Sequence, residues 1–131
     1  MIASPTNPNG GCGILTDGAC LMSDYYDPKD LPRFPEIGKD APDLWKAFLT
    51  WYNATFAEGA LSEREKSLIA LAVAHAVQCP YCIDAYTQAC LEKGSNLEQM
   101  TEAIHVAAAI RGGATLVHGV QMRNAASKIS M

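Results

Sequence analysis

Capping residues and a proline mark the starts of several helices in this chain, and these signals limit the fold to one class. Ser62 and Glu65 have the S-x-x-E spacing of a capping box, in which each residue satisfies a free amide of the other. Asn96 and Gln99 repeat that spacing. Pro80, between the two boxes, can open a helix but cannot continue one. No segment shows the alternation of a half-buried strand. The sequence therefore predicts an all-α fold.

Five helices are expected after Pro42. They cover, by apolar periodicity and end signals, residues 43–57, 62–78, 79–93, 96–111 and 114–128. Gly112 and Gly113 are expected to separate the last two, because glycine is a poor helix former. The 62–78 segment is apolar nearly all round, which is typical of a central buried helix. We expect one helical-bundle domain over residues 43–131, with a further apolar helix buried between copies in an oligomer.

The first 42 residues have a different composition. Residues 1–21 are rich in Gly, Pro, Asn and Ser and carry one charge, so they are expected to form a flexible extension. Residues 22–42 contain four prolines. They are expected to form an extended arm whose aromatic and aliphatic side chains lie over the helical surface.

Charge and hydropathy exclude several classes of function. A net charge of -4 argues against nucleic-acid binding, which needs a basic surface. No uncharged apolar run approaches the ~18 residues that span a bilayer, and no secretory signal is visible. We therefore expect a cytoplasmic protein with no membrane partner. Thiols in that compartment stay reduced unless they are catalytic or bind metal, so the five cysteines raise a question of function.

Cys79 and Cys82 form a C-x-x-C pair at the expected junction of two helices. Because Pro80 favours the first helical position, Cys79 is expected to cap the helix and Cys82 to lie in its first turn. The free amides and the dipole at such an end favour the thiolate. The spacing also permits a disulfide with little backbone movement. The pattern indicates a redox dithiol, with two buried structural cysteines as the plain alternative.

Two neighbours could handle protons for this dithiol. His75 precedes Cys79 by one helical turn, and Tyr86 follows Cys82 by one turn, so each could face a sulfur. His75 could act as a base and Tyr86 as a proton donor, although each could equally be an ordinary core residue. His75 and the two cysteines could also supply three zinc ligands. The fourth would be His105 or His118.

The stretch LSEREKSLIALAVAHAVQCPYCIDAYTQA resembles the core of the carboxymuconolactone decarboxylase / alkyl hydroperoxidase D-like family. The continuation TEAIHVAAAIRGGATLVHGVQMRNA is similar to the peroxidase-like branch associated with arsenosugar biosynthesis. The resemblance implies an all-helical fold that assembles as a homotrimer or homohexamer. It also implies that a C-x-x-C pair reduces hydroperoxides, with Cys82 attacking the peroxide and Cys79 resolving the product.

The chain departs from the family's peroxidase pattern at two positions. Tyr86 stands where that pattern has a histidine, and Ser67 stands where it has a glutamate. Both residues of the usual proton relay are therefore absent. His75 and Tyr86 could form a rearranged relay, with imidazole as the base and phenol as the donor.

We interpret the sequence as a thiol-dependent, peroxidase-like oxidoreductase acting on a small hydroperoxide or related electrophile. An external dithiol would reopen the disulfide. No organic cofactor is needed, and no nucleotide or phosphate loop is visible. One alternative is a non-catalytic helical protein whose neighbouring thiols bind a soft ligand such as trivalent arsenic. Another is a carboxymuconolactone decarboxylase, for which the dithiol would have no purpose.

Overall fold

The computed structural model describes residues 26–129, and in that range the chain contains helices and no strand. A 3₁₀-helix comes first, followed by four α-helices: η1 (Pro28–Gly38), α1 (Pro42–Phe56), α2 (Glu63–Ala76), α3 (Pro80–Glu92) and α4 (Leu97–Ile129). The predicted all-α class is confirmed. The expected extension over residues 1–21 lies outside the described residues.

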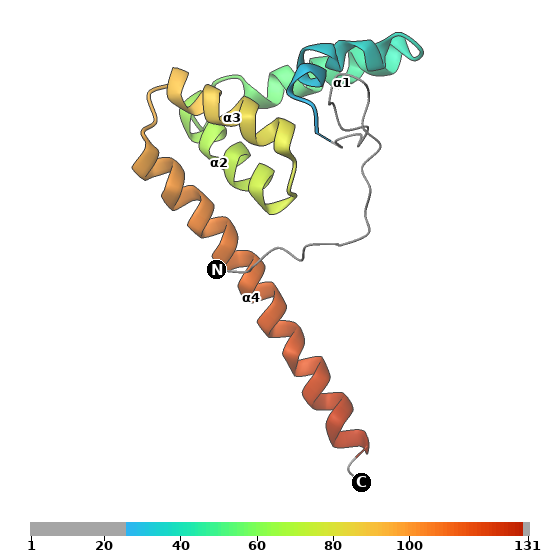
Figure 1. The fold of residues 1–131 in the computed structure, drawn as a ribbon, viewed down its shortest axis with the longest axis vertical. Helices are drawn as coiled ribbons and strands as arrows, with labels where there is room; N and C mark the ends of the chain where they lie inside the picture. The colour runs from blue at the N-terminus through green and yellow to red at the C-terminus, as the bar shows by residue number, and fades with distance from the viewer. Residues whose placement is uncertain (1–25, 130–131) are drawn as a thin grey trace, which may run out of the picture.

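Helix α2 is the centre of the fold, as its sequence predicted, but it is not buried all round, since Ile69 and Val73 expose 51% and 53% of their surface. It packs along both α3 and the N-terminal part of α4 (Figure 1). Leu71 of α2, Cys90 of α3 and Met100 of α4 form the core, and each exposes 4% of its surface or less. Tyr86 packs against this cluster from α3, which fixes the helix turn that carries the C-x-x-C pair.

Both predicted capping boxes are present. The Ser62 amide donates to Glu65 Oε2 at 2.7 Å, and the Glu65 amide donates to Ser62 Oγ at 3.2 Å. Asn96 and Gln99 make the same reciprocal bonds, at 3.1 and 2.9 Å. Each box satisfies amides that have no partner inside the helix, so α2 and α4 begin where the sequence indicates.

Helix α2 ends two residues earlier than expected, and the ending directs the chain into the C-x-x-C pair. Gln78 has a φ of 57°, the left-handed conformation that usually requires glycine. The Cys79 amide donates to the Ala74 carbonyl at 3.1 Å, and the Gln78 amide donates to the His75 carbonyl at 3.2 Å. This is a Schellman motif. Helix α3 ends in the same way, with Gly94 at the left-handed position (φ 82°).

The expected break at Gly112 and Gly113 is wrong. Residues 97–129 form one continuous helix, α4. Two glycines cost a helix about 2 kcal/mol in propensity, but neither glycine prevents helical φ and ψ, and no proline removes a hydrogen bond. The alanines and the arginine on their flanks favour helix. The predicted fourth and fifth helices are therefore one element.

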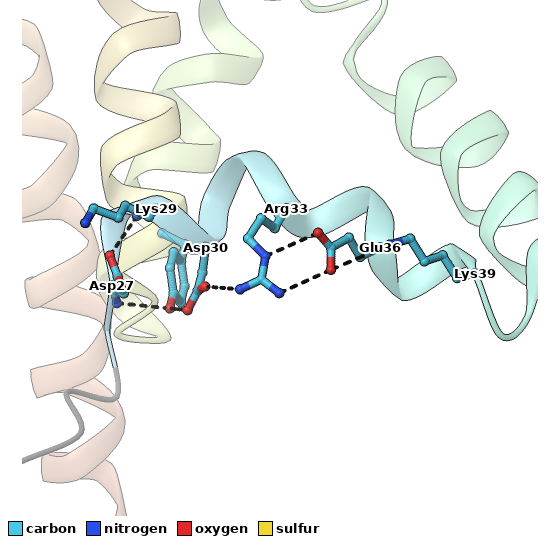
Figure 2. A network of polar contacts seen from close by, with 7 residues as sticks. Asp27, Lys29, Asp30, Arg33, Glu36 and Lys39 are labelled. Carbon is cyan, nitrogen blue, oxygen red and sulfur yellow. Dashed lines mark hydrogen bonds and ion pairs between the residues drawn. The ribbon is translucent and has the colours of Figure 1, made fainter.

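The expected extended arm is also wrong for most of its length, because residues 28–38 form the 3₁₀-helix η1. Proline fixes φ near -65°, a value that a 3₁₀-helix shares. Asp27 caps η1 by accepting a bond from the Lys29 amide at 2.9 Å. Arg33 then links one turn to the next by bonds to Asp30 and Glu36 (Figure 2).

The arm does lie on the helical surface, as predicted. The Phe34 ring meets the Trp45 and Phe48 rings of α1 edge-on, at centroid distances of 4.9 and 6.2 Å. Gly38 ends η1 against the Trp45 side chain. A Cβ at residue 38 would lie 2.9 Å from Trp45 Cβ and closer still to two ring atoms. Only glycine allows η1 to approach α1 this closely.

The C-terminal half of α4 extends away from the other described helices (Figure 1). From residue 105 to residue 129 no side chain is buried, although many are apolar. By length and composition alone, α4 is long and apolar enough to cross a membrane. A single helix of this kind is weak evidence for a membrane protein. The sequence was predicted to contain no uncharged apolar run of this length, and α4 does contain charges, since Arg111 interrupts its apolar stretch.

Candidate functional site

Cys79 and Cys82 occupy the places predicted for them at the start of α3. Cys79 is the N-cap, and its Sγ accepts a bond from the Cys82 amide at 3.3 Å. Cys82 lies in the first turn, and the two sulfurs are 2.6 Å apart. Both cysteines are free and half-buried. The pair can therefore close to a disulfide without moving the helix.

The predicted thiolate at Cys82 is wrong. Burial, followed by the hydrogen bond and the charge of Cys79, raises the pKa of Cys82 to about 11. The sequence argument relied on the free amides of the first turn. The Cys82 amide instead donates to Cys79 Sγ, so it does not stabilise a charge on Cys82 itself. Cys82 is consequently a neutral thiol at pH 7.

Tyr86 faces the same region from the next turn of α3, and its hydroxyl is hydrogen-bonded to the hydroxyl of Tyr52 on α1. Burial raises the pKa of Tyr86, and the neighbouring Tyr52, Cys82 and Cys79 raise it further. Tyr86 therefore keeps its proton across the physiological range.

Tyr52 was not predicted as a site residue, because its spacing placed it only on the apolar face of the first helix. A spacing of four places Phe48, Tyr52 and Phe56 on one stripe of α1. Their rings follow one another at centroid distances of 5.4 and 4.8 Å. A tyrosine in the middle of an aromatic stripe could have indicated Tyr52 as a candidate, because a buried hydroxyl needs a hydrogen-bond partner.

Two cavities meet at these residues. The first has a volume of about 490 Å³ and lies between η1 and the start of α3, and the second, of about 530 Å³, lies between α1 and α2. Cys82, Tyr86 and Tyr52 line both cavities. Cys79 lines only the first. Of the two sulfurs, Cys82 is therefore the one that a molecule could reach from either side.

The charges at the first cavity are paired with one another. Arg33 lies between Asp30 and Glu36 (Figure 2), at 3.1 Å and 3.2 Å. All three residues line the first cavity. Glu36 and then Asp30 raise the pKa of the Arg33 guanidinium. Because Asp30 and Glu36 already bind the Arg33 guanidinium, they compensate its positive charge. Arg33 therefore attracts an anionic ligand only weakly.

Polar contacts hold the first turn of η1 on the first turn of α3. The Tyr81 hydroxyl accepts a bond from the Asp27 amide at 3.3 Å and donates to Asp30 at 3.4 Å. The Tyr26 hydroxyl donates to Asp84, and its ring lies 4.8 Å from that of Tyr81. These contacts make η1 a wall of the cavity that contains the dithiol.

His75 belongs to neither cavity at the dithiol, so its predicted role as a base stays a prediction. His75 is half-buried on α2, lines neither cavity, and its Nδ1 is 2.9 Å from the Leu71 carbonyl. The expectation assumed that Cys79 continues the helical face of His75. Because α2 ends at Ala76 and Gln78 turns the chain, the one-turn spacing does not apply across this junction.

The described residues give the zinc alternative no support. Among residues 26–129 no group of three or more His, Cys, Asp or Glu side chains is placed to hold a metal ion.

The residues at and beside the family's glutamate position all have other partners. Ser67 is buried, and its hydroxyl donates to the Glu63 carbonyl at 2.9 Å. Glu63 forms an ion pair with Lys93 at 2.5 Å, which lowers the pKa of Glu63. Glu65 belongs to the capping box. The hydroxyls of Tyr86 and Tyr52 are thus the proton-carrying groups that share both cavities with Cys82.

Comparisons with known proteins agree with this fold. The sequence profile of the carboxymuconolactone decarboxylase family matches residues 42–123. A Paracoccus denitrificans protein described as "uncharacterized protein 4 in cox locus" is 41% identical over 97 residues, which cover 74% of this chain and 87% of that protein.

Two solved structures are similar as well. A crystal structure from Methanobacterium thermoautotrophicum has a TM-score of 0.62 at 33% identity, over 64% of this chain and 94% of that one. The apo crystal structure of a carboxymuconolactone decarboxylase family protein from Legionella pneumophila has a TM-score of 0.60 at 31% identity, over 71% and 84%. The arsenosugar-associated branch stays a prediction, but the extent of these matches establishes that the chain belongs to the carboxymuconolactone decarboxylase family.

Proposed function

We propose that this protein is a thiol-dependent, peroxidase-like oxidoreductase in which Cys82 and Cys79 are the redox dithiol. One observation carries the proposal: two free sulfurs 2.6 Å apart lie on the wall of a cavity of about 490 Å³. Such a volume suits a small organic molecule. Membership in a family with peroxidase-like and decarboxylase members supports the proposal without choosing between those activities.

The proposed reaction has two steps. Cys82 Sγ attacks the terminal oxygen of a hydroperoxide, the O–O bond breaks, an alcohol leaves, and Cys82 becomes a sulfenic acid. Cys79 Sγ then attacks Cys82 Sγ, the S–O bond breaks, and water leaves with the Cys79 proton. An external dithiol reduces the resulting disulfide and completes the cycle. We assign the attack to Cys82 because it lines both cavities, whereas Cys79 lines one.

Tyr86 is the proposed proton carrier of the first step. With a pKa of about 11, Cys82 must lose its proton as it attacks. The leaving alkoxide needs a proton at the same time. Tyr86 can give its own proton to the leaving oxygen and accept the thiol proton, which restores the phenol. Both groups start neutral, in agreement with the raised pKa values of Cys82 and Tyr86.

The surroundings of this reaction are also proposals. We propose that the protein is cytoplasmic, that its substrate is a small hydroperoxide, and that an external dithiol is its reductant. We also propose that it assembles as a homotrimer or homohexamer. The exposed apolar half of α4 supports the assembly, because a face of this kind needs a covering surface.

Turnover with a defined reductant tests the function. Cumene hydroperoxide and dithiothreitol are mixed with the protein, and peroxide consumption is followed for the wild type, Cys82→Ser and Cys79→Ser. With dithiothreitol we expect steady turnover by the wild type and none by Cys82→Ser. Without dithiothreitol, Cys79→Ser should consume one equivalent and stop as the sulfenic acid, because no second thiol is present to reduce it. Turnover by Cys82→Ser, or none by the wild type, would contradict the proposal.

The same samples test the two alternatives. Stoichiometric binding of arsenite without peroxide consumption would favour a soft-ligand binding protein, since paired thiolates suit soft metalloids. Decarboxylation of carboxymuconolactone that survives Cys82→Ser would favour the decarboxylase. Either result would replace the peroxidase proposal.

A further inference from the structure

We propose that Tyr52 is a positioning residue for the proposed reaction, which holds the Tyr86 hydroxyl so that the Tyr86 proton points at the leaving oxygen. The inference rests on the proposed function, and it assigns a role to a residue on a different helix from the dithiol.

Tyr52 and Tyr86 contact each other directly through their hydroxyls. The two hydroxyls are hydrogen-bonded, one from α1 and one from α3, and both side chains line the two cavities that Cys82 also lines. A phenol has one proton. When Tyr52 donates to Tyr86, the Tyr86 oxygen has accepted a bond and its own proton remains available for a molecule in the cavity.

Neighbouring aromatic rings hold both tyrosines in place. The Tyr52 ring lies between Phe48 and Phe56, at centroid distances of 5.4 and 4.8 Å. Phe56 also stacks on the Tyr86 ring, at 5.4 Å and an interplanar angle of 24°. Both rings are therefore held by one aromatic stripe, so the positions of the two hydroxyl oxygens are set before a substrate enters.

The chemistry follows from the charge that develops on Tyr86. As Tyr86 gives its proton to the leaving alkoxide, negative charge grows on its oxygen until the Cys82 proton arrives. A hydrogen bond from Tyr52 strengthens as that charge grows, because bonds to charged acceptors are stronger than neutral ones. No atom of Tyr52 is consumed, and the thiol, peroxide and phenol protons balance as in the two-step scheme.

The test compares two oxidants that differ in their leaving group. Cumene hydroperoxide expels an alkoxide, which needs a proton, whereas peracetic acid expels a stable carboxylate. We expect Tyr52→Phe to slow oxidation of Cys82 by cumene hydroperoxide roughly tenfold, while its rate with peracetic acid changes less than about twofold. Rates are measured by stopped-flow on the fully reduced full-length protein. Peptide mapping confirms oxidation at Cys82.

Tyr81→Phe is the matched control, since it also removes one hydroxyl from the first cavity. It should change both rates by the same factor. In addition, Tyr52→Phe/Tyr86→Phe should be no slower than Tyr86→Phe, because Tyr52 acts only through Tyr86.

Three results would overturn the proposal. Equal slowing with both oxidants would mean that Tyr52 only supports the fold, and an unchanged rate with cumene hydroperoxide would mean that it has no role. If the wild-type dithiol reacts with neither oxidant, the proposed function itself fails, which distinguishes that failure from a failure of Tyr52.

Discussion

At the scale of single residues, Cys82 holds its proton because burial and Cys79 disfavour its thiolate, which raises its pKa to about 11. A buried acid of this kind ionises later in the folded protein than in the unfolded chain. Its neutral form therefore favours the folded state below the ordinary thiol pKa, and that contribution is lost as the pH rises toward the folded value.

This raised pKa predicts a steep pH dependence of alkylation. Only the thiolate reacts with iodoacetamide, so the rate at Cys82 should rise about tenfold per pH unit from pH 7 to pH 10. The Cys79→Ser variant should react faster at each pH, because Cys79 contributes to the raised value. The rate is measured by mass spectrometry of the Cys82 peptide. A plateau below pH 8 would show an activated thiolate and contradict the structure.

Much of the site could be predicted from local spacing. Cys82 and Tyr86 lie one turn apart on α3, and Cys79 is the N-cap of that helix. The position of Pro80 and the one-turn spacing were therefore enough to place the three residues together. Tyr52 could not be placed in this way, because its contact with Tyr86 spans 34 residues and depends on how α1 packs. The ionisation of Cys82 depends on burial, which local spacing does not determine.

At the scale of the elements, α2 and α3 both end in a Schellman motif, but different residues adopt the left-handed conformation in the two motifs. Gly94 adopts the left-handed conformation freely, whereas Gln78 adopts it at a cost of about 1 kcal/mol. A Cβ at residue 94 would meet nothing within 4 Å, so only the backbone conformation matters there.

The two positions predict opposite effects on stability. Gly94→Ala should lower the free energy of unfolding by about 1 kcal/mol, and Gln78→Gly should raise it by about 0.5 kcal/mol. Urea unfolding of the reduced protein measures both. A loss of stability in Gln78→Gly would mean that the Gln78 side chain makes a contact that outweighs the backbone strain.

A third substitution tests how η1 is seated. Gly38→Ala should destabilise the protein by about 1–3 kcal/mol, because the added Cβ overlaps the Trp45 ring and η1 must move away from α1. Gly59→Ala is the control, since its nearest neighbour is the flexible end of Lys66 at 3.7 Å. Equal unfolding midpoints for the two variants would contradict the close packing of η1.

Element starts were predicted better than element continuity. Capping boxes act within four residues, so Ser62 and Asn96 marked two helix starts correctly. Gly112 and Gly113 were misread because propensity is a weak preference that the flanking helix overrides. The prolines of residues 28–35 were taken as signs of an extended chain, although their φ also suits the turns of η1.

At the scale of the whole molecule, α4 predicts association of several copies. Its exposed residues Val106, Ile110, Val117 and Val120 follow helical spacing and form one stripe, which is 54–70% exposed at each residue. Sedimentation should give three or six times 14.1 kDa. Val117→Glu should shift the protein to monomers, and Thr115→Glu, on the opposite side of the helix, should not. A wild-type monomer, or wild-type protein that binds lipid vesicles, would contradict this assembly.

The central claim is that Cys79 and Cys82 form a working redox pair, and one measurement tests it most directly. The intact mass of the fully reduced protein is recorded before and after one equivalent of cumene hydroperoxide, with Cys82→Ser as the control. The account predicts the loss of two hydrogen atoms, mapped by peptide analysis to a Cys79–Cys82 disulfide and absent from the variant. An unchanged mass with both thiols free would contradict it.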